Sequence, residues 1–473
     1  MNASRRLFLQ AGAALGAQAG LGPVAAPLAM SLAGLSALAA QSAQAADTST
    51  GYRALVCLFM SGGSDGHNWV VPIEASEYAL YAAARRELTW NSAQLLPITS
   101  TTQGSGRRFG MPLELQPLRD LYEAGHAAVI GNIGTLERPV SKDEYKAGIG
   151  LPSKLFSHND QQSIWQSLSP EGARSGWGGR MADILMSANA NPVFTTISTS
   201  GNAVFLTGNA VTQYQVGTEG PVMVKALTDS WTLGSSTLAA PLRRVLARGG
   251  SQTMQSEYAR VMQRSLDTSA ALQAALASVA VPAIPTTPIV LPSGATVTLS
   301  NESLTKQLRM TAQLIGAGQG LGLRRQVFMV NMGGFDTHSN QMRDQPLLMA
   351  KVAQSIGYFV GALQALGLMN NVTLFTASDF GRTLTSNGDG SDHGWGSHHV
   401  VAGGAVRGRE IYGRIPTTTV GTNDEVGSGR LLPSTGVTQL AATLGGWMGL
   451  TAAEQAMVLP NLGAFPGGTL GFV

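Results

Sequence analysis

The chain has 473 residues, of which 44% are hydrophobic and only 12% are charged. This composition excludes a mainly disordered protein, and the length allows one large α/β domain or two smaller ones. The 31 basic and 28 acidic residues nearly balance, so the net charge gives no reason to expect a nucleic-acid partner. The single cysteine, Cys57, excludes a disulfide within the chain, and its place in an apolar run favours a buried, inert thiol.

The first 46 residues are predicted to be a cleaved export signal. Residues 4–10, Ser-Arg-Arg-Leu-Phe-Leu-Gln, resemble a twin-arginine signal, and an uncharged stretch follows, with small residues at Ala43 and Ala45 that suit a signal peptidase. The stretch is also long enough for a transmembrane anchor. Because Pro23 and Pro27 interrupt it, we expect removal of the signal and no stable membrane insertion. The twin-arginine translocase is the expected partner during export, and the product is expected to be periplasmic or secreted.

After the leader, apolar runs typical of strands alternate with runs typical of helices. Strands are predicted at 53–60, 127–131, 326–330, 372–377 and 399–403. Helices are predicted at 76–88, 115–124, 252–279, 303–316, 342–366 and 436–450, with further helices beginning near Ser157 and Ser175. The alternation predicts an α/β fold with a mostly parallel sheet sandwiched by helices.

Residues 191–300 interrupt this pattern. Residues 191–250 are polar and rich in Gly, Thr and Ser, and residues 281–292 are too rich in proline to be helical. We therefore expect residues 47–473 to form a single domain in which 191–300 is an insertion that caps the functional site.

Three of the predicted strands end in a Gly-rich loop that carries Asp or His. Asp65 follows strand 53–60, Asp336 and His338 follow strand 326–330, and Asp379 follows strand 372–377. Parallel strands bring their carboxyl ends to one edge of a sheet, which is where α/β proteins place their sites. Asp and His are also ligands of zinc and related divalent metals. The sequence therefore predicts a metal site at this edge.

Each candidate also has a structural explanation. Asp65 suits a turn as well as a ligand. Asp336 and His338 are two apart, so an extended segment would direct both at one metal, although Asp336 alone could cap the following helix. Asp379 could bind a cation or pair with Arg382, whose guanidinium could otherwise hold an oxyanion.

Further candidates come from a histidine-rich segment and a predicted helix start. His393, His398 and His399 fall within seven positions, and at least one of them is expected to bind metal; His393 and His398 are the candidates. Ser157 is a candidate nucleophile at a helix amino terminus. A role as the helix N-cap would explain Ser157 equally well.

The motifs Gly-Gly-Phe-Asp-Thr-His, Thr-Ala-Ser-Asp-Phe-Gly-Arg-Thr, Asn-Gly-Asp-Gly-Ser-Asp-His-Gly-Trp-Gly and Gly-Arg-Leu-Leu-Pro resemble those of the exported bacterial family filed as domain of unknown function 1501. That family is similar in fold to the alkaline phosphatase and sulfatase superfamily. The resemblance implies hydrolysis of phosphate or sulfate esters with one or two divalent metals.

Transferred residue by residue, the resemblance implies that Asp65 and Asp379 bind one metal and that Asp336 and His393 bind another, with Ser157 as nucleophile. Two positions depart from the superfamily pattern. Phe380 stands where a histidine ligand is usual, and His338 lies two rather than four residues after Asp336. One metal site could therefore be incomplete, with His398 as a substitute ligand.

These expectations define a leading function and an alternative. The leading function is an exported hydrolase of phosphate or sulfate esters that acts on a small-molecule or glycan substrate. Its cofactor would be a divalent metal: zinc, manganese, calcium or magnesium. The alternative is a non-catalytic metal- or ligand-binding envelope protein that keeps the hydrolase fold. A redox enzyme is disfavoured because the chain has neither a Cys cluster nor a G-x-G-x-x-G fingerprint.

Overall fold

The computed structural model describes residues 51–228, 231, 234–246, 248–249 and 252–473. The chain from Thr48 onward forms one compact unit. The predicted leader lies outside the described residues.

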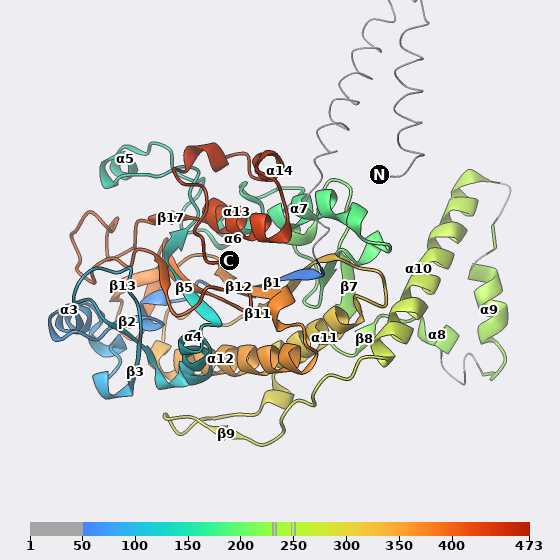
Figure 1. Ribbon diagram of the computed structural model, residues 1–473, viewed down its shortest axis with the longest axis horizontal. Coiled ribbons are helices and arrows are strands. Elements are labelled where there is room, and N and C mark those ends of the chain that lie inside the picture. The colour runs from blue at the N-terminus through green and yellow to red at the C-terminus, as the bar shows by residue number, and fades with distance from the viewer. Residues whose placement is uncertain (1–50, 229–230, 232–233, 247, 250–251) are drawn as a thin grey trace, which may run out of the picture. The chain divides into compact units, whose positions relative to one another are not determined.

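Within the described residues, a ten-stranded sheet forms the centre of this unit (Figure 1). Its order is β16-β5-β15-β12-β1-β11-β6-β7-β8, and β17 also pairs with β5. The strands are β1 (Arg53–Met60), β5 (Ala127–Gly134), β6 (Thr196–Ser198), β7 (Tyr214–Gly217), β8 (Gly220–Pro221), β11 (Arg325–Met332), β12 (Val372–Ser378), β15 (Ser397–Gly403), β16 (Ile411–Gly413) and β17 (Thr435–Gly436).

The strand directions decide which loops meet. β12, β1, β11, β6 and β7 run parallel to one another, so their carboxyl ends share one edge. β15 is antiparallel to both β12 and β5, and it therefore begins, at Ser397, on the edge where β12 ends. The prediction of a mostly parallel sheet is confirmed, with β15 as an antiparallel strand in its interior.

Helices cover both faces of the sheet (Figure 1). One layer holds α4 (Gln116–Glu123), α11 (Ser303–Ala317) and α12 (Gln341–Ala365), and the other holds α6 (His158–Ser167), α7 (Trp177–Leu185), α13 (Val437–Met448) and α14 (Ala452–Val458). Alternate residues of β11, such as Phe328 and Val330, are buried in a large core with Leu308 of α11 and Ile356 of α12. Burial of this apolar surface is the main force that holds the layers together.

Helix α12 is long and apolar enough to cross a membrane by composition. Its apolar side chains instead serve the core: 61% of the window that meets this criterion is buried, and the helix packs on α11 and α4. The helix predicted at 342–366 is confirmed as α12.

The remaining elements surround this core. They are α3 (Ala75–Arg85), α5 (Lys142–Ala147), α8 (Lys225–Thr228), α9 (Ala239–Leu246), α10 (Thr253–Ala277), a small sheet of β2 (Val71–Pro72), β4 (Phe109–Pro112) and β3 (Leu95–Ile98), and the pairs β9 (Ile289–Val290) with β10 (Thr296–Val297) and β13 (Arg382–Ser386) with β14 (Ser391–His393). The β13–β14 hairpin aligns Arg382 with His393.

Part of the predicted insertion at 191–300 belongs to the main sheet. β6 pairs with β11, and β7 pairs with β6. The segment Thr-Ile-Ser of β6 is too short and polar to indicate a strand by its pattern, which is why the sequence did not reveal it. α10 packs on α11 and β8, and the capping role expected for this region stays a prediction.

The buried imidazole of His399 predicts sensitivity to acid. Its Nδ1 lies 3.1 Å from the Thr376 hydroxyl, and its ring meets Trp165 edge-on. Burial lowers the pKa of His399 to about 3. Between about pH 6.5 and pH 3 the unfolded chain therefore binds a proton at this histidine that the folded chain does not, and the free energy of unfolding decreases as the pH is lowered.

We expect the fall in Tm between pH 7.5 and 5.5 to be smaller for His399→Leu than for the parent chain, because each such histidine contributes a slope of up to about 1.4 kcal/mol per pH unit. Thermal unfolding at the two pH values checks this. An equal fall in both proteins would contradict it.

Candidate metal centre

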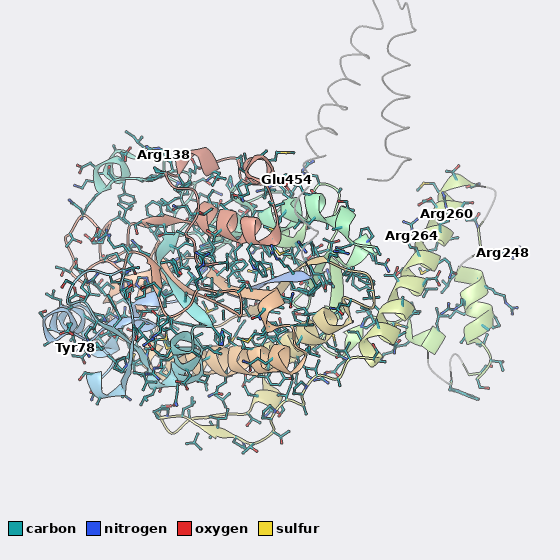
Figure 2. All side chains as sticks on the ribbon, in the orientation of Figure 1. Tyr78, Arg138, Arg248, Arg260, Arg264 and Glu454 are labelled. Atoms are coloured by element: carbon teal, nitrogen blue, oxygen red, sulfur yellow. The ribbon has the colours of Figure 1, made fainter. Side chains whose placement is uncertain are left out.

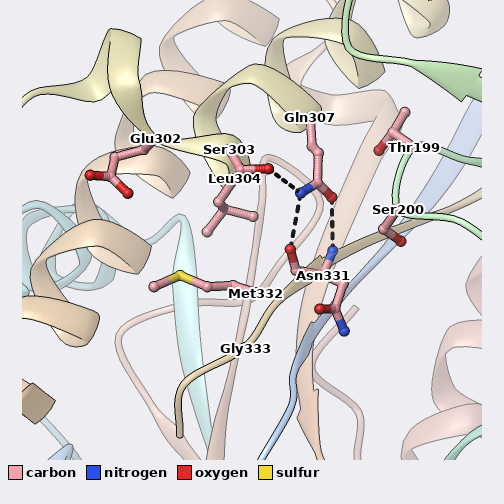
Figure 3. Close-up of a pocket in the computed structure, with 9 residues that line it drawn as sticks. All are labelled: Thr199, Ser200, Glu302, Ser303, Leu304, Gln307, Asn331, Met332 and Gly333. Carbon is pink, nitrogen blue, oxygen red and sulfur yellow. Dashed lines mark hydrogen bonds between the residues drawn. The ribbon is translucent and has the colours of Figure 1, made fainter.

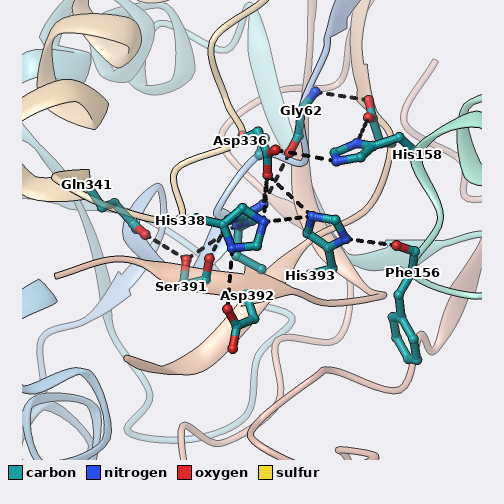
Figure 4. A network of polar contacts seen from close by, with 12 residues as sticks. Gly62, Phe156, His158, Asp336, His338, Gln341, Ser391, Asp392 and His393 are labelled. Atoms are coloured by element: carbon teal, nitrogen blue, oxygen red, sulfur yellow. Dashed lines mark hydrogen bonds and ion pairs between the residues drawn. The ribbon is translucent and has the colours of Figure 1, made fainter. Parts of the chain in front are cut away.

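The carboxylate of Asp336 lies among three imidazoles at the carboxyl edge of the sheet (Figure 4). Asp336 Oδ1 is 3.1 Å from His338 Nε2 and 3.3 Å from His393 Nε2, and Asp336 Oδ2 is 3.5 Å from His158 Nε2. The loop after β11 supplies Asp336 and His338, β14 supplies His393, and α6 begins with His158. Residues far apart in sequence thus meet at one point.

Each imidazole is anchored through its Nδ1 atom by an oxygen. These oxygens are Asp379 Oδ2, 2.5 Å from His158, the Phe156 carbonyl, 2.8 Å from His393, and Asp392 Oδ1, 3.3 Å from His338. An oxygen acceptor at Nδ1 favours the tautomer with its proton there. In the neutral rings the Nε2 lone pairs then face the Asp336 carboxylate, an arrangement that repels unless a cation or protons occupy the space between.

The donor set fits a divalent cation. One ligand atom each from His158, Asp336 and His393 lies within 4.8 Å of the other two, and His338 Nε2 lies 2.9 Å from His393 Nε2. Imidazoles whose other nitrogen donates to a carboxylate or carbonyl are the usual ligands of protein-bound zinc.

Arg382 fixes the position and charge of Asp336. Its fully buried guanidinium donates to Asp336 Oδ1 at 2.7 Å and to the Gly62 carbonyl at 3.3 Å. Burial alone would raise the pKa of Asp336, but the hydrogen bond and charge of Arg382, with smaller contributions from His338 and His158, lower the pKa below its usual range. The carboxylate is therefore anionic at neutral pH.

Burial also lowers the pKa of His393, although the Phe156 carbonyl opposes this. Its imidazole therefore stays neutral, and able to bind a metal, at a lower pH than a free imidazole.

Asp379 anchors the His158 ring at Nδ1. It is fully buried and accepts hydrogen bonds from the Gly62 backbone at 3.1 Å and from Gln162 at 2.9 Å, besides facing His158. The neighbouring Phe380 stacks against the rings of His158 and His393, with centroids 4.8 and 4.4 Å away. Asp379 is thus an indirect partner of the donor set, and Phe380 forms its apolar wall.

Ser157 occupies the N-cap position of α6, but its side chain makes no capping hydrogen bond. Its hydroxyl donates instead to Asp160 Oδ2 at 3.0 Å. The preceding loop is strained, because Lys154 and Phe156 have φ angles of 45° and 71°, a region that costs non-glycine residues about 1–3 kcal/mol. This conformation directs the Phe156 carbonyl at His393 Nδ1.

The structure does not bring Asp65 or His398 into this group. Asp65 is buried in an ion pair with Arg85 and also accepts hydrogen bonds from Gln341 and the His67 backbone. His398 Nδ1 accepts from the Asn132 backbone at 3.0 Å, and burial lowers its pKa to about 3. Their assignment as ligands stays a prediction that these contacts do not support.

Sequence reasoning missed His158 as a donor. The signal that could have found His158 is its place directly after Ser157, as a second polar, potentially ligating residue at the same predicted helix start. The anchors Asp392 and Gln162 were also missed, since neither follows a predicted strand.

A cavity of about 420 Å³ opens on the same edge of the sheet (Figure 3). Its lining combines hydroxyl, amide and carboxylate groups with two apolar side chains: Thr199, Ser200, Glu302, Ser303, Leu304, Gln307, Asn331, Met332 and Gly333. Asn331 donates to the Ser61 hydroxyl at 2.7 Å, and the next residue, Gly62, contacts both Asp379 and Arg382. The cavity therefore shares the β11 loop with the donor group and adjoins the loop after β1.

The chain matches the family described as protein of unknown function (DUF1501) over residues 122–458, and it belongs to this family. The resemblance drawn from its motifs is confirmed. The match includes the four residues that converge on the candidate metal centre, whereas Asp65 lies outside it. No curated protein matches the chain.

Solved structures give weak likenesses. A sulfatase from a Pseudoalteromonas species shares 11% identity, with 86% of this chain and 74% of that one covered and a TM-score of 0.32. The C-terminal periplasmic domain of EptC from Escherichia coli, in complex with zinc, shares 9% identity over 76% and 74% of the chains (TM-score 0.32). The lipoteichoic acid synthase LtaP from Listeria monocytogenes shares 7% identity over 86% and 74% (TM-score 0.32). TM-scores this low do not establish a common activity.

Two substitutions separate an anchoring residue from a structural one. Asp379→Asn removes the charged acceptor at His158 Nδ1, and we expect a loss of about 10- to 100-fold in zinc affinity. Asp65→Asn leaves the Arg85 charge buried without its partner, and we expect a loss of about 3 kcal/mol of stability with zinc affinity unchanged. Titration calorimetry with Zn²⁺ and thermal unfolding check both. Lost zinc binding with an unchanged Tm in Asp65→Asn would show that Asp65 is a ligand after all.

Proposed function

We propose that this protein is an exported, metal-dependent hydrolase of phosphate or sulfate esters. The observation that carries the proposal is the convergence of three anchored imidazoles on the carboxylate of Asp336. Asp336 remains 44% exposed on its side chain, so a substrate can approach the group from solvent.

His158, Asp336, His338 and His393 would hold the cation. Three nitrogens and one oxygen suit zinc, whereas magnesium and calcium prefer oxygen ligands. When bound, a divalent cation would lower the pKa of a coordinated hydroxyl and offset the charge that develops on the transferring group. Arg382 holds Asp336 in place, and this replaces the oxyanion-clamping role that the sequence suggested for it.

Ser157 is the proposed nucleophile. Its hydroxyl is free of a capping role and hydrogen-bonded to the buried Asp160, which orients the hydroxyl and can accept its proton. Attack of Ser157 Oγ on phosphorus or sulfur would release the alcohol portion of the ester, and water would then hydrolyse the serine ester. The strained residues before Ser157 are typical of backbone that is held in place for function.

The cavity next to the donor group is the proposed site for the alcohol portion. Its hydroxyl and amide groups, set against Leu304 and Met332, suit a polyol or glycan, whose faces alternate between hydroxyl and C–H surface. Thr199 and Ser200 come from the 191–300 region, so this region would influence substrate choice, as the sequence suggested.

Export through the twin-arginine route is part of the proposal and is supported by the sequence of residues 4–46. This route carries folded proteins, and so a cation could be bound before export.

The second candidate is a non-catalytic metal- or ligand-binding envelope protein. Two contacts favour it: Phe380 fills a position where the superfamily is expected to place a ligand, and the Arg382 guanidinium is engaged by Asp336 instead of facing a substrate. In this case the group would still bind a cation, but Ser157 would have no substrate.

The decisive test is metal content and turnover in the same preparations. We expect about one equivalent of zinc by mass spectrometry and turnover of an aryl phosphate or aryl sulfate. Asp336→Ala should lose both, and Ser157→Ala should keep the metal and lose turnover by about a thousandfold or more. Asp143→Ala, which removes an aspartate whose side chain is 94% exposed, serves as the control. Stoichiometric metal without turnover on a broad panel of esters would favour the binding protein.

A further inference from the structure

A concentration of positive charge lies on α9, at Arg248 and on the amino-terminal half of α10, together called the basic arm (the described residues of 239–264). It contains five arginines, Arg243, Arg244, Arg248, Arg260 and Arg264, and one acidic residue, Glu257. The rest of residues 47–473 carries 24 basic and 27 acidic residues. The arm is therefore positive on a chain that is otherwise slightly negative.

All five arginines are exposed, and Figure 2 labels three of them, Arg248, Arg260 and Arg264, on this part of the chain. Glu257 pairs with Arg260. Since Glu257 is the arm's single acidic residue, it can offset only one of the five positive charges, and the arm retains a net positive charge toward solvent.

The same arm exposes an apolar stripe. Met254, Tyr258 and Val261 lie four and three residues apart on one face of α10, and they are 83%, 60% and 52% exposed. On α9, Val245 is 68% exposed. At 100° per residue, Leu272 and Leu276 lie on the same face of α10 as Met254 and Tyr258. Because Leu272 and Leu276 are buried in the core, this apolar face is covered toward the carboxyl end of α10 and exposed toward its amino end within the described residues.

Two of the arginines, Arg260 and Arg264, lie on α10 beside this stripe. At 100° per residue, Arg264 and Arg260 both border one side of the Met254–Tyr258–Val261 stripe, at roughly 90° and 130° from its centre. A helix with exposed apolar and aromatic side chains bordered by arginines is the pattern of helices that lie in a membrane interface. The apolar side chains enter the boundary between headgroups and acyl chains, and the arginines contact anionic headgroups.

We propose that the basic arm docks peripherally on a membrane surface that contains anionic phospholipid. A soluble polyanion would use the arginines and leave the apolar stripe in water. A second copy of the chain would bring two positive arms together at an electrostatic cost. An anionic lipid surface satisfies both features of the arm. This inference rests on α9 and α10 alone, and it does not depend on the proposed catalytic activity.

Vesicle co-sedimentation tests the proposal, with variants made in residues 47–473 so that the leader contributes no binding. This part contains the whole compact unit that begins at Thr48. We expect binding to phosphatidylcholine vesicles that contain phosphatidylglycerol, little binding to phosphatidylcholine alone, and weakening with added salt. Arg243→Gln combined with Arg264→Gln should weaken binding about thirtyfold, at about fivefold for each charge. Replacing Met254, Tyr258 and Val261 with Ser should weaken it at any salt concentration.

Matched controls change exposed residues elsewhere. Val290→Ser, at a valine that is 72% exposed, and Arg174→Gln, at an exposed arginine, should bind like the parent. Equal binding to both kinds of vesicle, no binding to either, or full binding by the arm variants would overturn the proposal. Dimerisation of the parent that the serine replacements abolish, seen by analytical ultracentrifugation, would assign the stripe to a second copy instead.

Discussion

The site depends on how the three imidazoles are anchored. Asp379, Asp392 and the Phe156 carbonyl each occupy an Nδ1 atom, and this turns the three Nε2 atoms toward one carboxylate. Three aspartates, Asp336, Asp379 and Asp392, touch the imidazoles, and Arg382 offsets one of them. With neutral rings, this leaves a formal charge of −2 around a cluster of lone pairs, which a divalent cation would neutralise. The anchors therefore determine both the direction and the charge of the donor group.

The sheet topology makes this convergence possible. β1, β11 and β12 are parallel neighbours, so the Gly62, Asp336 and Asp379 loops emerge side by side. The antiparallel β15 begins on the same edge, and the β13–β14 hairpin that precedes it therefore carries Arg382 and His393 to the loops of its neighbours. An all-parallel order would have started that strand at the opposite edge. The one reversed strand in the interior thus sets the edge at which the preceding hairpin supplies Arg382 and His393.

The sequence predicted the long elements well, because strands such as Val372–Ser378 and helices such as α12 have strong apolar periodicity. It also predicted the edge that carries Asp336, His338 and Asp379, since residues that follow parallel strands share an edge. It did not predict the ion pair of Asp65 with Arg85, which is twenty residues away on α3, nor the place of His158, whose ring is aligned by Asp379 in the loop after β12. Both outcomes depend on tertiary pairings that no local pattern encodes. Short strands such as β6 were not predicted from the sequence, because three residues carry too little periodicity.

Glycines at the meeting point explain why the loops can approach so closely. Gly62 has a φ of 122°, and a Cβ there would lie 2.3 Å from the Asp336 backbone nitrogen. A Cβ on Gly390 would lie 2.3 Å from the carbonyl of His338. Any side chain at either position would push apart loops that now touch through their backbones. The ligand atoms of His158, Asp336 and His393 lie within 4.8 Å of one another, so separating the loops would remove the convergence. The Gly-rich character of these loops is therefore a geometric requirement of the site.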